Sequence, residues 1–159
     1  MEAAELTAAR GGRRWLLPVP SPPQEQGPDL RRVGLHPSFW YPLARSRDLR
    51  PGSTHLAMFA GQAIALARSE RGEVFALDDR CAHRQFPLHR GIVCGEQLRC
   101  AYHAWSYHPD GRVASVPYLR KEQPRPTGVK SYACREAYGY VFVFTGERDE
   151  AEQIGRAHV

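Results

Sequence analysis

The feature that most constrains this 159-residue chain is a pair of short segments that each hold one cysteine and one histidine. The first segment is Cys81-Ala82-His83 and the second is Cys100-Ala101-Tyr102-His103. A structural zinc site usually takes two cysteines from one segment and two histidines from another. Here each segment offers one soft thiolate and one imidazole, which favours two metal ions that each take one ligand from each segment.

If ligands of the same kind bind the same ion, the two cysteines hold one iron and the two histidines hold the other. This is the arrangement of a Rieske [2Fe–2S] centre. Cys81 and Cys100 are therefore the predicted ligands of the buried iron, and His83 and His103 are those of the more exposed iron. Two other interpretations stay open from the residues alone. One is a single zinc ion, and the other is four ordinary residues in a chain with four cysteines and seven histidines.

The residues between Trp40 and Thr145 have no amphipathic helical period of useful length. Short apolar runs instead alternate with turn residues, of which His108-Pro109-Asp110-Gly111 is a strong turn signal. The sequence therefore predicts an all-β domain of small antiparallel sheets, with both ligand segments at strand ends or hairpin tips. The expected strands are 55–60, 62–68, 74–77, 104–107, 112–116, 132–135 and 140–144.

Composition divides the chain into three parts. Residues 1–33 are expected to form a flexible extension, because the stretch from Pro18 to Pro28 is rich in proline. Residues 34–146 form the predicted metal-binding domain. Residues 147–159 are a charged tail in which a frayed helix is expected.

The net charge of +5 raises the question of nucleic-acid binding. No run of five or six basic residues occurs and no nucleic-acid-binding motif accompanies the basic residues, so we do not expect it. The basic residues, among them Arg31-Arg32 and Arg45–Arg50, instead predict a solvated face or a docking surface for an acidic electron-transfer protein.

The chain is also not expected to enter a membrane. No apolar stretch is long enough to cross a bilayer, and the stretch after Arg13-Arg14 ends at Pro18, too early for a signal peptide. The expected compartment is the cytoplasm. Cys94, in the predicted loop between the ligand segments, and Cys134, in a predicted strand, are then expected to be reduced thiols.

Further segments surround the ligands in a specific order. They are Phe39–Leu43, Asp48–Gly52, Gly72–Leu77, Cys81–Arg84 with Pro87, Leu88 and Gly91, Cys100–Tyr107 with Asp110 and Gly111, and Tyr138–Phe144. Together they resemble the N-terminal Rieske domain of the α subunits of ring-hydroxylating oxygenases. Gln85 and Ala104 depart from this pattern where glycine is frequent, and Ala101 departs where proline is common. Alanine at a site that needs a positive φ costs stability, so the ligand loops are where the backbone is expected to differ.

The resemblance implies a Rieske fold with a hairpin sub-domain that grips a [2Fe–2S] cluster. It also implies electron transfer from a reductase or ferredoxin towards a mononuclear iron in a catalytic oxygenase domain or subunit, with His103 facing that iron in a neighbouring subunit. The chain is not expected to oxygenate a substrate alone, because the remaining histidines show no two-histidine, one-carboxylate pattern. These histidines are at positions 36, 55, 89, 108 and 158. The alternatives are a self-contained Rieske-type ferredoxin and an inactive truncated oxygenase fragment.

The resemblance bears on the reduction potential as well. High-potential respiratory Rieske proteins have an extra cysteine in each ligand loop, which form a disulfide, and a serine and a tyrosine that donate hydrogen bonds to sulfur. Phe86 and Tyr102 occupy the places of those cysteines and Trp105 that of the serine, whereas Tyr107 matches the tyrosine. With no disulfide and one donor lost, we expect a potential of roughly −150 to 0 mV.

Overall fold

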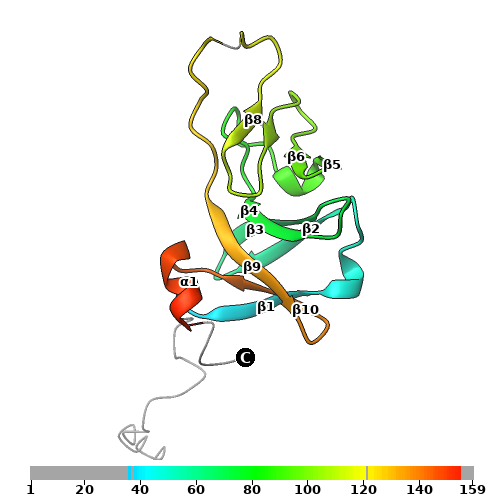
Figure 1. The fold of residues 1–159 in the computed structure, drawn as a ribbon, viewed down its shortest axis with the longest axis vertical. Helices are drawn as coiled ribbons and strands as arrows, with labels where there is room; N and C mark the ends of the chain where they lie inside the picture. Colours follow the sequence, from blue (N-terminus) through cyan, green and yellow to red (C-terminus); the bar gives the residue numbers. More distant parts are fainter. Residues whose placement is uncertain (1–35, 37, 121, 155–159) are drawn as a thin grey trace, which may run out of the picture. The chain divides into compact units, whose positions relative to one another are not determined.

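The computed structural model describes residues 36, 38–120 and 122–154. They belong to one compact unit, which spans Leu35–Val159. The extension predicted for residues 1–33 lies outside the described residues, as does the end of the predicted tail. The described part is mostly β-structure, as the sequence predicts, and it contains two antiparallel sheets (Figure 1).

The larger sheet has six strands in the order β1-β10-β9-β4-β3-β2. The expected strands 55–60 and 62–68 pair as a hairpin, in which Ala60 and Gly61, with φ angles of 48° and 80°, join β2 to β3. Two successive left-handed residues form the tight turn that matches the twist of a hairpin. The strands are β1 (Trp40–Arg45), β2 (Thr54–Phe59), β3 (Gln62–Arg68), β4 (Val74–Asp78), β9 (Ser131–Ala137) and β10 (Tyr140–Phe144), and a short 3-10 turn, η2 (Ser46–Asp48), follows β1.

Strand β3 is buried on both of its faces. Ile64 and Leu66 pack into one hydrophobic core, and the alternating Ala65 and Ala67 pack into a second core on the other side. All four side chains have no exposed surface. Because successive side chains of a strand point to opposite faces, the alanines give the second core a flat surface that another sheet can approach closely.

That other sheet has four short strands in the order β5-β6-β7-β8 and lies in the chain between β4 and β9 (Figure 1). Its inward side chains Val93, Leu98, Tyr107 and Val113 share the core of Ala65. The predicted small sheets are thereby confirmed. One prediction is wrong: Cys94 ends a strand instead of lying in a loop, because its pairing with Gln97 extends the hairpin. The elements are η3 (Leu88–Arg90), β5 (Ile92–Cys94), β6 (Gln97–Arg99), β7 (Ser106–Tyr107) and β8 (Val113–Ser115).

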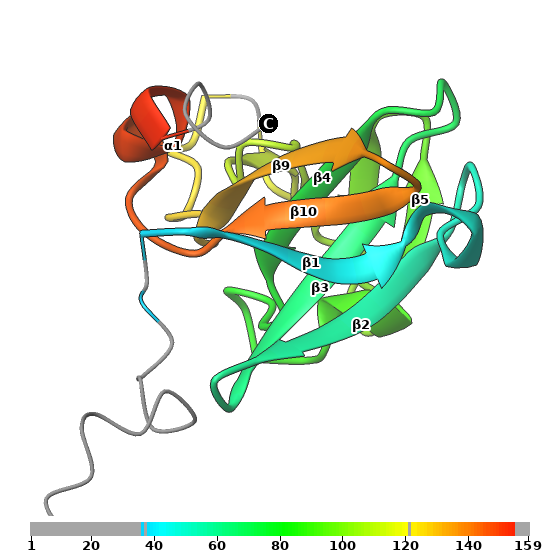
Figure 2. The same ribbon diagram turned by 90° about the horizontal axis from the view of Figure 1, so that it is seen from below.

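The helix expected in the charged tail is present as α1 (Arg148–Ile154). It lies beside β9 (Figure 2), and its Ala151 side chain is only 3% exposed. The Ser38 hydroxyl donates a hydrogen bond of 2.7 Å to the Glu150 carboxylate. These contacts hold the described helix on the sheet. Within the described residues, no helix is both long enough and apolar enough to span a membrane.

A buried arginine ties the ends of several strands together. The Arg68 guanidinium at the end of β3 donates to the Leu49 carbonyl (2.6 Å) and, in a bidentate pair, to both carboxylate oxygens of Glu136 on β9 (2.8 and 2.9 Å). The hydrogen bonds from Arg68 hold the pKa of Glu136 at about 2, well below its ordinary value. The Arg68 side chain is 10% exposed and that of Glu136 is 36% exposed, so solvent weakens the pair only in part.

We expect the substitution Glu136→Gln to lower the thermal midpoint of unfolding by several degrees at pH 7, because it leaves a buried guanidinium without its partner. The cost is ~1–2 kcal/mol, between that of an exposed pair and that of a fully buried one. Because the folded-state pKa is depressed, this stabilisation is present above the unfolded-state pKa and is lost as pH falls towards about 2. Thermal melts between pH 7 and pH 3 check both statements.

The control is Glu96→Gln, which breaks the exposed pair of Glu96 with Arg71. It should change the midpoint little at any pH. If the difference in thermal midpoint between wild type and Glu136→Gln stayed constant down to pH 3, the link between the pKa of Glu136 and stability would be contradicted.

Candidate metal centre

The two ligand loops have the same backbone turn. In the first, the Cys81 amide donates to the Phe86 carbonyl (2.9 Å) and the Gln85 amide donates to the Cys81 carbonyl (2.7 Å). In the second loop, the amides of residues 100 and 104 make the equivalent bonds to the carbonyls of residues 105 and 100 (2.8 and 3.1 Å). In each loop, the cysteine amide therefore donates to the carbonyl five residues later, and the amide four residues later donates to the cysteine carbonyl.

This turn needs a left-handed residue at its fifth position. Gln85 and Ala104 occupy that position with φ angles of 54° and 56°. These are the two positions where the sequence departs from a frequent glycine, so both loops keep the turn with a non-glycine residue in a left-handed conformation. A non-glycine residue pays ~1 kcal/mol for this conformation.

We therefore expect Ala104→Gly to stabilise the protein by ~0.5–1 kcal/mol, since glycine adopts this φ without steric strain. The control is Ala101→Gly in the same loop, where φ is not positive and the change should be neutral or destabilising. Thermal melts of the two variants measure the difference. If Ala104→Gly were the less stable of the two, the strain argument would be wrong.

The four predicted ligands sort into two pairs. Cys81 and Cys100 are each 2% exposed. Burial raises the pKa of Cys100, and the adjacent Cys81 thiol raises it further. His83 and His103 are exposed, with their ring centroids 4.7 Å apart. Desolvation lowers the pKa of His103, and the charges of His83 and Arg84 add to this, which favours the neutral imidazole that a metal ligand requires.

The pairing fits a two-metal cluster better than one zinc ion. In residues 36, 38–120 and 122–154, no group of three or more histidine, cysteine, aspartate or glutamate side chains is placed to hold a single ion. A structural zinc site needs four such ligands around one ion. A [2Fe–2S] cluster needs only two protein ligands for each iron, and one buried sulfur pair beside one exposed nitrogen pair meets that need.

Three aromatic residues close around the loops. Phe86 and Tyr102 have ring centroids 5.5 Å apart, so the two residues that the sequence resemblance places at the disulfide of high-potential Rieske proteins contact one another. Trp105 stacks on His83 with a centroid distance of 5.0 Å and an interplanar angle of 2°. These contacts fix the orientation of the imidazole and join the two loops without a covalent bond.

The Tyr107 hydroxyl lies 3.0 Å from the Cys81 sulfur and accepts a hydrogen bond of 3.0 Å from the Ala82 amide. Tyr107 has no exposed surface. Because the amide uses a lone pair of the oxygen, the hydroxyl proton is free to point at a Cys81 thiolate. Burial and the neighbouring Cys81 raise the pKa of Tyr107, so the hydroxyl keeps its proton. The predicted donor is therefore within hydrogen-bond distance of its sulfur.

A hollow of about 690 Å³ opens on the histidine side of the loops. Its wall includes His83, His103 and Trp105, together with Tyr118 from the segment after β8. Tyr102 and Tyr118 expose 54% and all of their surfaces, respectively. The exposed imidazoles thus sit among aromatic side chains that a partner protein can contact.

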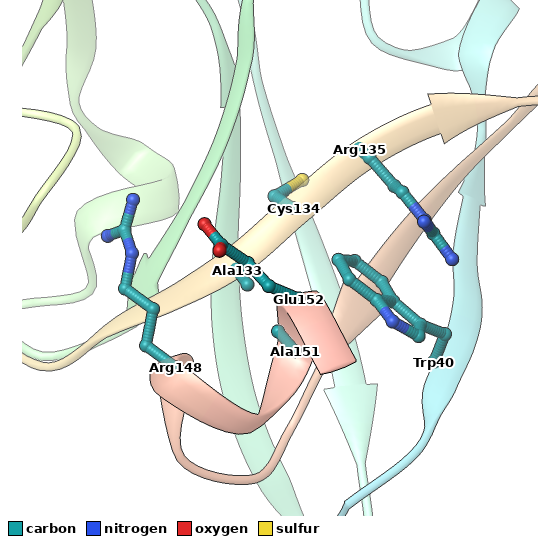
Figure 3. A pocket seen from close by; sticks show the side chains of 7 residues that line it. All are labelled: Trp40, Ala133, Cys134, Arg135, Arg148, Ala151 and Glu152. Carbon is teal, nitrogen blue, oxygen red and sulfur yellow. The ribbon is translucent and has the colours of Figure 1, made fainter. Parts of the chain in front are cut away.

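A second hollow lies between α1, β9 and the start of β1 (Figure 3). The Arg135 guanidinium lies 4.0 Å from the centroid of the Trp40 ring. Burial raises the pKa of Cys134 on β9 to about 12, which makes this thiol unreactive. Cys94 and Cys134 form no disulfide in the described residues. Cys134 is the one cysteine in the lining of this hollow, which includes no histidine.

Sequence reasoning missed two residues beside the first ligand loop. Asp79 is 5% exposed, and His89 hydrogen-bonds to it with both its backbone and its side chain. In the sequence, His89 is only one of the five histidines that show no two-histidine, one-carboxylate pattern. The ten-residue separation of the two residues gives no periodic signal, so only the fold brings them together.

Comparisons with known proteins agree with this geometry. The model of the Rieske [2Fe-2S] domain matches residues 39–133. The chain is 34% identical to 4beta-methylsterol monooxygenase of Methylococcus capsulatus, over 81% of this chain and 35% of that protein. It is 30% identical to the oxygenase subunit of 3-chlorobenzoate-3,4-dioxygenase of Comamonas testosteroni, over 82% of this chain and 33% of that protein.

Solved structures give the same result. A crystal structure of dicamba monooxygenase matches with a TM-score of 0.68 and 27% identity, over 77% of this chain and 38% of that chain. NdmA of Pseudomonas putida CBB5 matches with a TM-score of 0.63 and 29% identity, over 69% of this chain and 34% of that chain. The chain thus spans about a third of the length of the curated relatives that it matches.

Proposed function

This chain belongs to the Rieske [2Fe–2S] domain family, and we propose that it carries single electrons in an oxygenase system, between a reductase or ferredoxin and a mononuclear iron on a catalytic oxygenase domain or subunit. The observation that carries the proposal is the separation of a buried thiol pair from an exposed imidazole pair. The family binds a [2Fe–2S] cluster, which when bound supplies a one-electron redox centre.

The residues of the chain have distinct roles in this proposal. Cys81 and Cys100 hold the cluster from the buried side and exclude water from the sulfur ligands. His83 and His103 hold it from the exposed side, where Trp105 orients the His83 ring by stacking. Both histidines line the hollow with Tyr118, and we assign the exit towards the acceptor to His103, as the family resemblance implies. The centroids of the Tyr102 and His103 rings are 3.7 Å apart.

Charge supports an acidic electron donor. Arg80, Arg84 and Arg99 each adjoin a proposed ligand in the chain, and all three are exposed. Within the described part of the chain, none of them is in an ion pair. Unpaired positive charge beside a redox centre steers an acidic partner towards it. The basic pair Arg31-Arg32 lies outside the described residues, and the Arg45–Arg50 cluster lies in β1 and the turn after it. Only the arginines of the ligand loops adjoin the proposed ligands, so these loops are the docking surface that we propose.

The expected compartment, the cytoplasm, is part of the proposal. Cys94 and Cys134, the two cysteines outside the proposed ligand set, form no disulfide, and reduced cysteines are the rule in the cytoplasm.

The proposal is tested by supplying the purified, cluster-loaded chain with NADH, a ferredoxin reductase and an aromatic substrate. We expect the chain to take up one electron and pass it to an added acceptor such as cytochrome c, with no hydroxylated product. Oxygen activation of this type needs an iron held by three protein ligands, and the described residues contain no such group. Product should form only when a catalytic oxygenase component is added.

Hydroxylated product from the chain and reductase alone would contradict this assignment of roles. A chain that reduces cytochrome c but does not reduce any added catalytic oxygenase component would favour a self-contained ferredoxin.

A further inference from the structure

Asp79 and His89 close the first ligand loop at its base. Asp79 directly follows β4 and stands two residues before Cys81. One carboxylate oxygen accepts the backbone amide of His89 at 2.7 Å, and the other pairs with Nδ1 of the His89 ring at 2.6 Å. The Asp79 side chain is 4% exposed and that of His89 is 21% exposed. Both oxygens of the buried Asp79 carboxylate therefore bond to His89. These bonds join the two ends of the segment 79–89, which contains Cys81 and His83.

The His89 end of this segment is itself fixed. The Thr54 hydroxyl of β2 donates to the His89 carbonyl at 2.6 Å. Leu88, its neighbour in η3, has no exposed surface and belongs to the core shared with β3. A side chain at Gly91 would come within 2.4 Å of the Arg99 carbonyl, so the end of the loop touches the strand that leads to Cys100. His89 is thus held against β2, β3 and β6 by its neighbours, and its bonds to Asp79 connect the start of the first ligand loop to these strands.

Within the loop, the backbone bonds of the turn, the contacts of Tyr107 with Cys81 and Ala82 and the stacking of Trp105 on His83 restrain the ligands, but none of them holds the two ends of the loop together. Gln85 has a φ of 54° in the turn that holds Cys81. A strained turn keeps its conformation only where the surrounding structure holds its ends. Of the two ligand loops, the second is short, because it closes between adjacent paired strands, β6 and β7. The first spans the distance from β4 to β5 and has no strand pairing across its base.

We propose that Asp79 is a positioning residue for the cluster: through His89 it holds the first ligand loop so that Cys81 and His83 meet Cys100 and His103. The inference rests on the proposed ligand set. Two charge-assisted hydrogen bonds from His89 to a buried carboxylate are stronger than the neutral bonds inside the loop. Without them, the first loop moves relative to the second, and the cluster is held less firmly although the two sheets stay folded.

The experiment compares cluster loss in the full chain after loading with iron and sulfide. Variants Asp79→Ala, Asp79→Asn and His89→Ala are exposed to an excess of iron chelator, and the decay of visible absorbance is followed. We expect Asp79→Ala to lose the cluster at least tenfold faster than wild type, with Asp79→Asn in between. The double variant Asp79→Ala/His89→Ala should be no faster than Asp79→Ala, because the two residues act as one pair.

Asp110→Ala is the matched control. The Asp110 carboxylate also accepts one backbone and one side-chain N–H from a single residue, Arg112 (3.0 and 2.6 Å), but it is exposed and lies in the turn before β8. It should lose the cluster at the wild-type rate. The second readout is the paramagnetic resonance spectrum of the reduced protein, which we expect to broaden in Asp79→Ala while far-ultraviolet circular dichroism is unchanged. A general loss of stability alone would leave the spectrum of the bound cluster as it is.

Equal decay and equal spectra for wild type and Asp79→Ala would overturn this inference alone. If Asp79→Ala fails to fold, His89→Ala, which keeps the backbone bond to the carboxylate, decides the matter by the same two readouts. A wild-type chain that binds no cluster would overturn the proposed function and this inference with it, so the two failures are distinct.

Discussion

Replacing either Cys81 or Cys100 with serine is expected to remove the cluster completely, from two iron atoms per chain to almost none. Both cysteines are 2% exposed, so water has little access to the site to substitute for a lost thiolate. A serine hydroxyl is a much weaker ligand for iron than a thiolate, because its proton is hard to remove at neutral pH. Iron and acid-labile sulfide, measured per chain after anaerobic purification, give the result directly.

Cys94→Ser and Cys134→Ser are the controls, since neither residue lies in a ligand loop. Both variants should keep wild-type iron and sulfide. Replacing His83 or His103 is expected to leave an altered or labile centre, because an exposed position can recruit another ligand. Stoichiometric zinc without sulfide in the wild-type protein would refute the two-metal assignment, and so would a full cluster in either ligand-loop cysteine variant.

The parts of this site that could be predicted from the sequence are the ones set by local spacing. The two mixed cysteine–histidine segments identify the ligands, since a ligand loop is a local structure. The turn at Gly61 and the apolar run of β10 identify strands for the same reason. Tyr107 could be matched to its role because it stands at a fixed distance after Cys100.

The parts that could not be predicted depend on contacts between distant residues. Asp79 and His89 meet only because η3 packs on β2 and β3. Phe86 and Tyr102 replace a disulfide by ring contact, although each looks like an ordinary aromatic residue in the sequence. The pairing of Cys94 with Gln97 depends on the register of β5 and β6, and the composition of a three-residue strand does not predict its register. The helix on β9 depends on Ala151, a small residue with no strong signal of burial.

The other large effect concerns the reduction potential, for which we expect roughly −150 to 0 mV in the wild-type protein. No disulfide joins the loops, because aromatic rings occupy its place, and Trp105 brings no hydroxyl to the sulfurs. Tyr107 is the one donor found at its predicted place, 3.0 Å from the Cys81 sulfur. A hydrogen bond to sulfur stabilises the more electron-rich reduced state more than the oxidised state, so it raises the potential.

Tyr107→Phe should therefore lower the potential, by about 45–90 mV if the bond differs by ~1–2 kcal/mol between the two states. The effect should not depend on pH near neutrality, because burial raises the pKa of Tyr107 and the hydroxyl stays protonated.

Tyr132→Phe is the matched control. Tyr132 is also buried, at 3% exposure, but its hydroxyl accepts from the Gln62 amide on β3 and has no contact with a proposed ligand. Protein-film voltammetry near pH 7 measures all three proteins. A wild-type midpoint above about +150 mV would rule out the argument from the missing disulfide and serine. An unchanged midpoint in Tyr107→Phe would show that the 3.0 Å contact holds the loop at Ala82 without tuning the cluster.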